Sequence, residues 1–437
     1  MPVSPARGAA FDVLLRVETT DAYASELLHS SRTEKLSSAD HGLTTEIVMG
    51  VLRWRSVLDE HIASYLDKPL GKFDVEVITA LRMGAYQLLF LDRIPAHAAI
   101  NESVELVKKA RKRSAAGMAN AVLRKISAQY SAMSSRSNQD PLGTHPTWLV
   151  QRWERTYGIE AMQATCSYDQ TTPQTAIRAN KTLIEELTTE AIQLEPGRLL
   201  NQAYTVTTGD ITRTRAFRDK RLTIQDEGSQ LIALLLGRGQ RILDCCAAPG
   251  GKTRILAEQN PRSTVIAAEL HRHRAALMRR LVPLPNVHII AADIRSMPVA
   301  IHFDRILVDA PCTGTGTLAR NPEIKWRLTP DDISRMQAYQ LEIVSAAIKQ
   351  LAPGGELLYS TCSLEPEENE AVVEKALAAN PEFRLIDCRI ELHRLREDHE
   401  LVIDNDNVES LLSGPYLRTI PGVHPTDGFF AAILEKK

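Results

Sequence analysis

The sequence predicts a multidomain protein with an all-α N-terminal bundle, a small α+β middle domain and a C-terminal α/β domain built on a mostly parallel, doubly wound sheet. Apolar residues recur at helical spacing over 1–130, helix-like and strand-like stretches mix over 147–235, and apolar strand-like runs alternate with helices over 236–437. With 437 residues, of which 44% are hydrophobic, the chain is long enough for about three domains with cores of their own.

Composition and charge exclude several classes of protein. Lys and Arg number 52 against 54 Asp and Glu, so a uniformly basic nucleic-acid-binding surface is excluded, although a local basic patch is not. No apolar run reaches the roughly 18 residues of a membrane helix, and the N-terminus lacks the apolar stretch of a signal peptide. Six cysteines are too few for a disulfide scaffold, so a reducing cytoplasm is expected. No paired metal-ligand spacing occurs, and no metal is expected.

The N-terminal bundle is predicted from helical periodicity. Phe11, Leu14 and Val17 recur at helical spacing, and no alternating, strand-like run interrupts the pattern up to residue 130. Residues 131–146 are expected to form a linker, because the stretch is rich in serine, contains proline and glycine and has little to bury.

The remaining elements follow from short sequence runs. In the middle domain WLVQRWERTY and ELTTEAIQL suit helices, while TAIRAN, AYTVTT and RLTIQ suit short strands. In the C-terminal domain RILDCC, TVIAAEL, VHIIAAD, DRILVDAP and GELLYSTC are nearly continuous apolar runs, which is typical of strands buried on both faces. Helical stretches such as RAALMRRL lie between them, and this alternation predicts the doubly wound parallel sheet.

The loop after the first of these strands is a candidate ligand site, because ligands of doubly wound sheets lie beyond the carboxyl ends of the strands. Gly250 and Gly251 allow a tight turn and a close approach of ligand to backbone. The loop is not a phosphate-binding Gly-x-x-x-x-Gly-Lys-Thr motif, since its first position is Cys246, and it is not a Gly-x-Gly-x-x-Gly motif either.

Three acidic residues end or follow consecutive predicted strands: Asp244, Glu269 and Asp293. An acid at the end of the second strand is placed to bind ribose hydroxyls. Carboxylates at this edge without a phosphate cradle suit a nucleoside ligand without phosphates, and S-adenosylmethionine fits. The alternative is that these acids cap the following helices.

Cysteines follow the fourth and fifth predicted strands, in the runs VDAPC, which ends at Cys312, and YSTC, which ends at Cys362. If these strands are parallel neighbours, both thiols lie at the same rim as the cofactor loop. A single cysteine is most often a small buried apolar residue. Two at strand ends, each beside polar residues, favour a role in chemistry.

The chemistry expected of such thiols is addition to a pyrimidine. C5 of cytosine is a poor nucleophile, but a thiolate that adds at C6 makes C5 an enamine carbon able to attack a sulfonium methyl group. A thiol suits this step because its pKa of about 8.5 leaves some thiolate near neutrality. A base must then remove the C5 proton before the thiolate leaves. Asp309 is expected to contact N3 of the base, where burial would raise its pKa and help it act as an acid.

Four motifs, DCCAAPGGKT, DAPCTGTG, NPEIKW and STCSLEPEENE, resemble those of the Sun/Fmu family of bacterial RNA cytosine-C5 methyltransferases. The likeness extends to PAHAAINESVELVKKARKRSAAGMANAVLRKI and to the terminal DGFFAAILEK, so it covers nearly the whole chain. The resemblance implies S-adenosylmethionine as cofactor and an RNA cytosine as substrate. It implies Cys362 as the nucleophile, while Cys312 would assist breakdown of the covalent adduct and product release.

The resemblance also implies a set of cofactor contacts. Glu269 would bind the ribose and Asp293 would lie near the adenine. Asp309 would stand where cofactor and base meet, and Lys252 would steady that junction. The implied cofactor loop comprises Cys246, Ala247, Ala248, Pro249, Gly250, Gly251 and Lys252.

The N-terminal domain of this family resembles NusB, an all-helical RNA-binding protein, and this points to 16S ribosomal RNA as the substrate. The chain departs from the family in Ala319-Arg320, where two basic residues are usual, and in LVPLPNV, where a Leu-Gly is usual. The same chemistry on transfer RNA or another ribosomal cytosine, and a noncatalytic RNA-binding assembly factor, remain alternatives. Nothing in the sequence demands more than a monomer.

Local basic clusters are expected to contact RNA, although a solvated helix face is the alternative for each. The target base must leave its stack to reach a pocket, so a looped or single-stranded site is favoured. Trp326 would either stack on RNA or lie in a core, and Gln225, Asp226 and Ser229 would line the cofactor entrance. The expected RNA contacts are Lys108, Lys109, Arg111, Lys112, Arg113, Arg215, Arg218 and Arg320.

Overall fold

The computed structural model describes residues 3–30, 33, 35–132, 141–297 and 301–437. Contacts divide the chain into two compact units. The N-terminal unit comprises residues 1–172 and 318–327, and the C-terminal unit comprises residues 173–317 and 328–437. Half of the predicted linker, residues 133–140, lies outside the described residues, and the predicted domain boundaries stay predictions.

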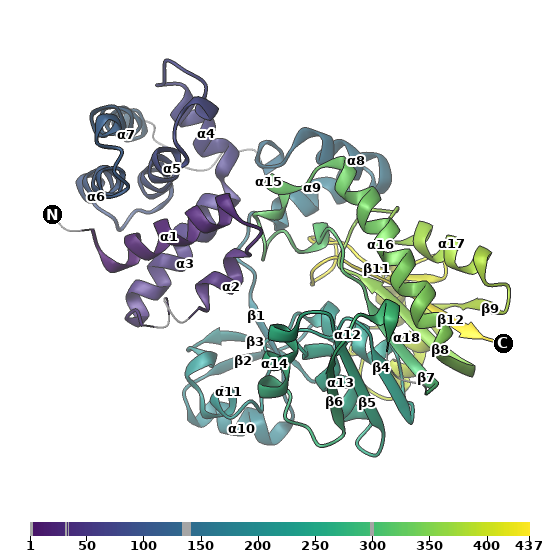
Figure 1. Cartoon of the computed structure of the whole chain (residues 1–437). Coiled ribbons are helices and arrows are strands. Elements are labelled where there is room, and N and C mark those ends of the chain that lie inside the picture. Colours follow the sequence, from purple (N-terminus) through teal and green to yellow (C-terminus); the bar gives the residue numbers. More distant parts are fainter. Residues whose placement is uncertain (1–2, 31–32, 34, 133–140, 298–300) are drawn as a thin grey trace. The chain divides into compact units, whose positions relative to one another are not determined.

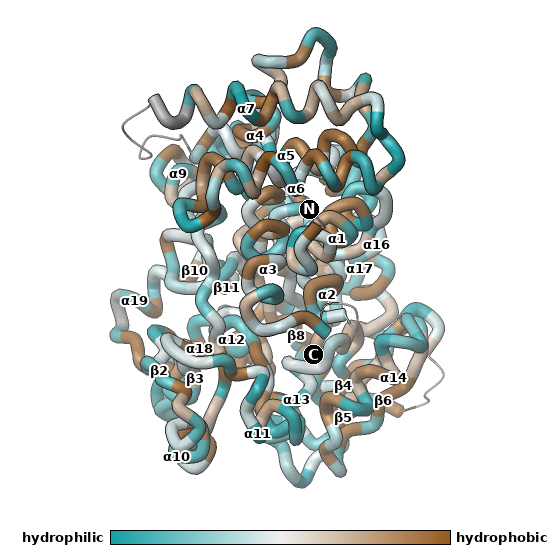
Figure 2. Tube along the Cα trace, turned by 90° about the vertical axis from the view of Figure 1, so that its left-hand side faces the viewer, coloured by the Kyte–Doolittle hydropathy of each residue, from teal (hydrophilic) through white to brown (hydrophobic). Residues whose placement is uncertain are grey.

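The N-terminal unit is helical throughout its described part (Figure 1). Phe11, Leu14 and Val17 are all buried, and they pack with side chains such as Ile47 and Leu81 in one core. Hydrophobic and hydrophilic residues both recur along these helices (Figure 2), as expected for helices that bury one face. The helices are α1 (Pro5–Thr19), α2 (Ala24–Leu28), α3 (Ser38–Arg53), α4 (Arg55–Ala63), α5 (Val75–Phe90), α6 (Ala96–Lys109), α7 (Ala116–Ala132), α8 (Thr147–Tyr157), α9 (Ile159–Tyr168) and α15 (Ile324–Arg327), with a short 3-10 helix at Pro141–Thr144.

The segment 318–327, which carries the NPEIKW motif, packs within the N-terminal unit although it is distant in sequence. Glu323 accepts a hydrogen bond from the backbone N–H of Ala24 at 2.7 Å. The indole N–H of Trp326 donates to the carbonyl of Leu52 at 2.7 Å. Its ring also lies 5.3 Å from the Lys325 ammonium, so contacts within the N-terminal unit fix the position of Trp326.

Lys325 is the most deeply buried cation of this segment, at 1% exposed. Its ammonium donates to the carbonyl of Arg53 at 3.2 Å. Burial lowers the pKa of Lys325 to about 8, despite the opposing charge of Asp169. A buried lysine whose pKa lies below its ordinary value opposes folding at neutral pH, because the unfolded chain keeps the ammonium hydrated.

We expect the effect of Lys325→Met on the free energy of unfolding to depend on pH. Between about pH 8 and the ordinary lysine pKa of 10.5, the unfolded chain binds more protons at this position than the folded chain. The contribution of Lys325 to stability therefore rises with pH across that window. The unfolding free energy of the variant minus that of the natural protein should fall by up to about 3 kcal/mol between pH 7 and 10.5.

Urea unfolding followed by tryptophan fluorescence measures this difference, because all the tryptophans of the chain lie in the N-terminal unit. They are Trp54, Trp148, Trp153 and Trp326. Lys349→Met, at the end of a helix of the C-terminal unit, is the control, because it removes a lysine outside the unit that contains the tryptophans. A difference in unfolding free energy for Lys325→Met that does not change with pH would contradict the lowered pKa of Lys325.

The C-terminal unit begins with a small antiparallel sheet in the order β1-β3-β2. One prediction here was wrong: ELTTEAIQL is not one helix, because Ala191 takes a left-handed backbone conformation with φ of 59° and the N–H of Ile192 bonds to the carbonyl of Leu187. RLTIQ forms only an isolated bridge through Ile224. The elements are β1 (Thr175–Arg178), α10 (Lys181–Thr189), β2 (Gln193–Pro196), β3 (Ala203–Thr208) and α11 (Arg215–Arg218).

In the described part of this unit the main sheet has nine strands, in the order β10-β11-β12-β8-β7-β4-β5-β6, with β9 paired to β12. Strands β6, β5, β4, β7 and β8 are parallel, and β12 joins β8 in antiparallel register. The strands are β4 (Arg241–Asp244), β5 (Thr264–Glu269), β6 (Val287–Ala291), β7 (Phe303–Asp309), β8 (Leu351–Thr361), β9 (Phe383–Ile386), β10 (Leu412–Ser413), β11 (Tyr416–Thr419) and β12 (Phe429–Lys436).

Helices cover both faces of this sheet. Alternate strand residues enter two cores: Leu307 and Leu358 pack with one set of helices, whereas Ile306 and Tyr359 pack with α16 and α17, which run beside the sheet in Figure 1. The predicted fold class is therefore confirmed. The helices are α12 (Glu227–Leu235), α13 (Gly251–Gln259), α14 (Arg272–Leu281), α16 (Pro330–Lys349), α17 (Glu370–Ala379), α18 (Cys388–Glu397) and α19 (Asn405–Ser410).

Candidate active site

The first part of the site is the turn between β4 and α13. Asp244 ends β4 and is 1% exposed; its Oδ2 accepts a hydrogen bond from the Thr253 hydroxyl at 2.7 Å. Its Oδ1 is buried and has no partner among the described residues. Burial raises the pKa of Asp244 to about 7, partly offset by the bond from Thr253.

The two glycines allow this turn to be tight and leave space beside its backbone. Gly250 has φ of 109°, a conformation that side chains rarely adopt, and it precedes the N-terminus of α13. A Cβ on Gly251 would come within 3.0 Å of the Gln225 amide. The turn thus leaves free N–H groups of the α13 N-terminus and the unpartnered Asp244 oxygen beside it, and these fit a polar ligand such as the expected cofactor.

The acids predicted for the cofactor lie at the ends of neighbouring strands. Glu269 ends β5, is 4% exposed, and accepts a hydrogen bond from the N–H of His271 at 2.9 Å. Its second oxygen lies 3.8 Å from Arg274. Burial raises the pKa of the Cys246 thiol well above its ordinary value, and the charges of Asp244, Asp309 and Glu269 act in the same direction. The charges of these three carboxylates thus all act on Cys246, at the start of the turn.

Asp293 follows β6, and its carboxylate pairs with another side chain of the same unit. Arg295 pairs with its carboxylate at 2.7 Å, and this interaction lowers the pKa of Asp293. The same guanidinium lies 5.0 Å from the centre of the Tyr339 ring. Contact between Asp293 and an adenine stays a prediction.

Lys252 and Asp309 form an ion pair at the centre of the site. The ammonium of Lys252, in the first turn of α13, lies 2.8 Å from Oδ2 of Asp309 at the end of β7. The hydroxyl of Ser360 donates to the other Asp309 oxygen at 2.9 Å. Burial lowers the pKa of Lys252, but the charge and hydrogen bond of Asp309, with a contribution from Cys362, outweigh it and raise the pKa. Lys252 is thus a cation close to both Asp309 and Cys362.

The two predicted site thiols meet. Sγ of Cys312 and Sγ of Cys362 lie 3.3 Å apart, and both side chains are half-buried. The strands that precede them, β7 and β8, are parallel neighbours, as the sequence analysis expected. The hydrogen bond to Cys362, burial and nearby negative charge raise the pKa of Cys312 well above its ordinary value. Within the described residues none of the cysteines forms a disulfide bond.

Sequence reasoning missed one residue that binds both cysteine loops. Glu368, in the EPEENE run, is fully buried and accepts hydrogen bonds from Thr313 and Ser363, the residues that follow the two cysteines. A glutamate in an acidic run is usually solvent-exposed, so the only signals were its place in the STCSLEPEENE motif and its position six residues beyond Cys362.

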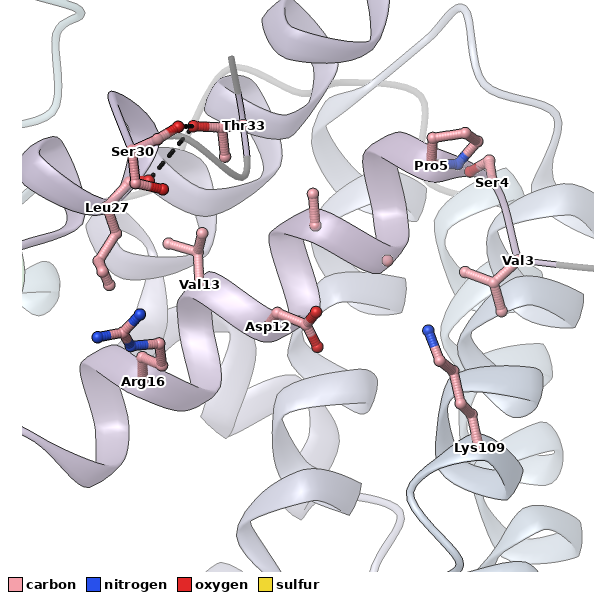
Figure 3. Close-up of a pocket in the computed structure, with 12 residues that line it drawn as sticks. Val3, Ser4, Pro5, Asp12, Val13, Arg16, Leu27, Ser30, Thr33 and Lys109 are labelled. Carbon is pink, nitrogen blue, oxygen red and sulfur yellow. Dashed lines mark hydrogen bonds between the residues drawn. The ribbon is translucent and has the colours of Figure 1, made fainter. Parts of the chain in front are cut away.

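The first predicted RNA cluster ends α6 and begins the next connection in the N-terminal unit. Lys108 pairs with Glu105 at 2.7 Å, and Lys112 pairs with Asp74 at 2.9 Å. Lys109, Arg111 and Arg113 are exposed and have no acidic partner in the described part of the chain. Figure 3 shows Lys109 reaching from the end of α6 toward Asp12 and Val3 at a pocket along α1.

The other predicted contacts are dispersed. Arg215 pairs with Asp219 at 3.3 Å, while Arg218 is exposed; both belong to α11 of the C-terminal unit. Arg320 is half-buried in the N-terminal unit. Of the residues expected at the cofactor entrance, Gln225 donates to Ser229 at 2.9 Å and Asp226 caps α12.

The described residues contain neither a candidate metal site nor a helix able to span a membrane. No group of three or more His, Cys, Asp or Glu there has the geometry to hold a metal ion. None of the described helices has the length and apolar character needed to cross a membrane.

Comparisons with known families match three consecutive parts of the chain. Residues 231–435 match the family described as "16S rRNA methyltransferase RsmB/F". Residues 4–128 match the NusB family, and residues 145–210 match the "Methyltr_RsmF/B-like, ferredoxin-like domain". The resemblance stated from the motifs is confirmed.

Curated proteins are similar over the full length of the chain, and solved structures over all or part of it. The chain is 33% identical to the "Probable ribosomal RNA small subunit methyltransferase B" of Bacillus subtilis, over 100% of both chains. It is 32% identical to the "Ribosomal RNA small subunit methyltransferase B" of Vibrio cholerae, over 99% of this chain and 97% of that protein. The crystal structure of PH0851 covers 100% of both chains with a TM-score of 0.79 and 23% identity, which supports the fold. NSun6 from Pyrococcus horikoshii with SFG covers 67% of this chain and 98% of that chain, with a TM-score of 0.56 and 21% identity.

Proposed function

Because the chain belongs to the RsmB/F family of 16S rRNA methyltransferases, whose members are S-adenosylmethionine-dependent RNA cytosine-C5 methyltransferases, we propose that it methylates C5 of one cytosine in 16S ribosomal RNA. The observation that carries this proposal is the pair of thiols 3.3 Å apart, with Lys252 and Asp309 beside them. Two thiols that touch at the carboxyl edge of a parallel sheet suit a reaction in which one adds to the base and the other assists release.

We assign the thiol steps to the two cysteines separately. Cys362 adds to C6 of the cytosine, which makes C5 nucleophilic. Cys312, whose raised pKa favours the neutral thiol, assists breakdown of the adduct. Asp309, when its carboxyl is protonated, donates that proton to N3 of the base, and Lys252 holds the resulting carboxylate in place.

The turn from Cys246 to Lys252, with Glu269 at the next strand end, would hold S-adenosylmethionine. When bound, this cofactor supplies an electrophilic methyl group. Glu269 orients the ribose through its carboxylate, and Gly250 and Gly251 allow the close approach that the turn requires.

Methylation of defined RNA tests the proposed function. The protein is incubated with labelled S-adenosylmethionine and either deproteinised 16S RNA or small-subunit particles from cells that lack it, and the product is mapped by bisulfite sequencing. We expect one protected cytosine in 16S RNA. Methylation confined to transfer RNA would favour the same chemistry on another substrate, and RNA binding without transfer to any RNA would favour an assembly factor.

The free basic residues of the N-terminal unit should contribute to RNA binding. We expect the double variant Lys109→Ala/Arg113→Ala to weaken RNA binding and to lower the slope of log K against log salt by about 1.5, since each lost phosphate contact removes somewhat less than one released cation. The measurement is a salt titration of RNA affinity by filter binding.

The matched control is Lys108→Ala/Lys112→Ala, which removes two cations that already pair with Glu105 and Asp74. It should change the slope much less. Equal slopes for the two double variants would place the RNA elsewhere.

We further propose that the protein acts as a monomer in the cytoplasm, where its cysteines stay reduced.

A further inference from the structure

Glu368 is a buried carboxylate that the proposed chemistry does not use. It lies two residues before α17 and is 0% exposed. Its Oε2 accepts the backbone N–H of Thr313 at 2.9 Å and Nε2 of Gln340 at 2.9 Å. Its Oε1 accepts the hydroxyls of Thr313 at 2.5 Å and Ser363 at 3.0 Å. Four donors satisfy the carboxylate, as a buried charge requires.

The partners of Glu368 flank the two thiols. Thr313 follows Cys312, and Ser363 follows Cys362. Gln340 donates at 2.9 Å to the carbonyl of Pro311, the residue before Cys312, through the same amide nitrogen that binds Glu368. One carboxylate therefore bonds to the neighbours of both cysteines.

Other bonds fasten the first loop on both sides of Cys312. Before it, the N–H of Ala310 donates to the carbonyl of Ser360, at the end of β8, at 2.8 Å. Beyond it, the N–H of Gly316 donates to the carbonyl of Cys362 at 2.9 Å, and the N–H of Leu364 donates to the Thr315 hydroxyl at 2.9 Å. The stretch around Cys312 is fastened to the second loop by Glu368, with a weaker 3.2 Å contact between the Thr313 and Ser363 hydroxyls.

We propose that Glu368 is a positioning residue, which sets the separation of the Cys312 and Cys362 sulfur atoms by holding both of their loops on one carboxylate. The assignment of a reaction to these thiols rests on the proposed function. The bridge, meaning the hydrogen bonds by which Glu368 joins Thr313 and Ser363, does not depend on it. The carboxylate also places negative charge beside Cys312, which favours the neutral thiol. The titratable groups that act on Cys312 are Cys362 and Glu368, and Tyr359 is buried nearby.

Glu368→Gln tests the charge and keeps the bridge. The amide oxygen still accepts from Thr313 N–H and Gln340, and the amide NH₂ donates to the two hydroxyls. In a Cys362→Ser background, alkylation of Cys312 by iodoacetamide is followed against pH by mass spectrometry of its peptide. We expect the apparent pKa of Cys312 to fall by about 0.5 to 1 pH unit. Glu374→Gln, an exposed acid of α17, is the control and should leave the profile unchanged.

Thr313→Val tests the bridge and keeps the charge. It removes the 2.5 Å hydroxyl bond while nearly preserving shape. We expect kcat for methyl transfer to fall about 10- to 100-fold, the effect of a small misplacement of reacting groups, with the KM for S-adenosylmethionine unchanged. Thr313→Ser, which restores the hydroxyl, should recover most of kcat.

The two measurements separate failure of this inference from failure of the proposed function. Alkylation needs no RNA, so an unchanged Cys312 profile in Glu368→Gln overturns the charge effect of Glu368 on Cys312 whether or not the protein methylates RNA. A Thr313→Val enzyme with the kcat of the natural protein overturns the positioning role. If Glu368→Gln does not fold by circular dichroism, the Thr313→Val and Thr313→Ser pair decides alone.

Discussion

Replacing Cys362 by alanine is expected to abolish the covalent adduct with RNA that contains 5-fluorocytosine. The fluorine at C5 cannot be removed as a proton is, so the natural protein should stay attached to the base after methyl transfer. Without the Cys362 thiol no bond to C6 forms, and methyl transfer should fall by at least about 1,000-fold, the scale on which loss of an enzyme nucleophile acts. Denaturing electrophoresis of labelled RNA measures the adduct.

Cys312→Ala should give the opposite phenotype. The nucleophile remains, but the thiol that assists breakdown is gone, so adduct should accumulate even with ordinary cytosine RNA. Cys388→Ala removes a buried thiol of the same unit, in α18, and should leave the adduct as in the natural protein. If Cys312→Ala loses the adduct and Cys362→Ala retains it, the two roles are reversed.

The meeting of these thiols was predictable because it depends on topology. Parallel strands bring their carboxyl ends to one rim, and the apolar runs that end at Asp309 and Thr361 identify β7 and β8 from sequence alone. The same reasoning placed Glu269 at the rim. Strand periodicity and the position of a residue after its strand were sufficient for this part of the site.

Contacts between distant loops were not predictable. Glu368 and Thr313 are 55 residues apart, and no periodicity relates them. The NPEIKW segment reads as part of the catalytic domain, yet Trp326 donates to Leu52, 274 residues away. Such pairings depend on how side chains meet after folding. The wrong helix at ELTTEAIQL has a more local cause, since a left-handed alanine at 191 carries no distinctive sequence signal.

Asp309→Asn is expected to lower kcat about 100- to 1,000-fold, the range in which a positioned acid or base contributes. Asparagine keeps the size of the side chain and still accepts from Ser360, so the strand end should not change. It removes the carboxylate that holds Lys252 at 2.8 Å and, in the protonated form of the residue, the acid that we assign to N3 of the base. Asp304→Asn is the control, because Asp304 lies near the start of β7 and binds backbone N–H groups of Gln240 and Arg241 there.

A double-mutant cycle with Lys252→Met distinguishes a shared role from two separate ones. If Lys252 acts by holding Asp309, Lys252→Met should lower kcat less than Asp309→Asn, and the double variant should cost little more than Asp309→Asn alone. Steady-state kinetics with saturating cofactor measures all four proteins. Losses that simply multiply would mean that Lys252 acts on Cys362 or on the cofactor independently of Asp309, which its position beside Cys362 also allows. Lys252 and Asp309 would then have separate roles despite their ion pair, and protonation of N3 would depend on Asp309 alone.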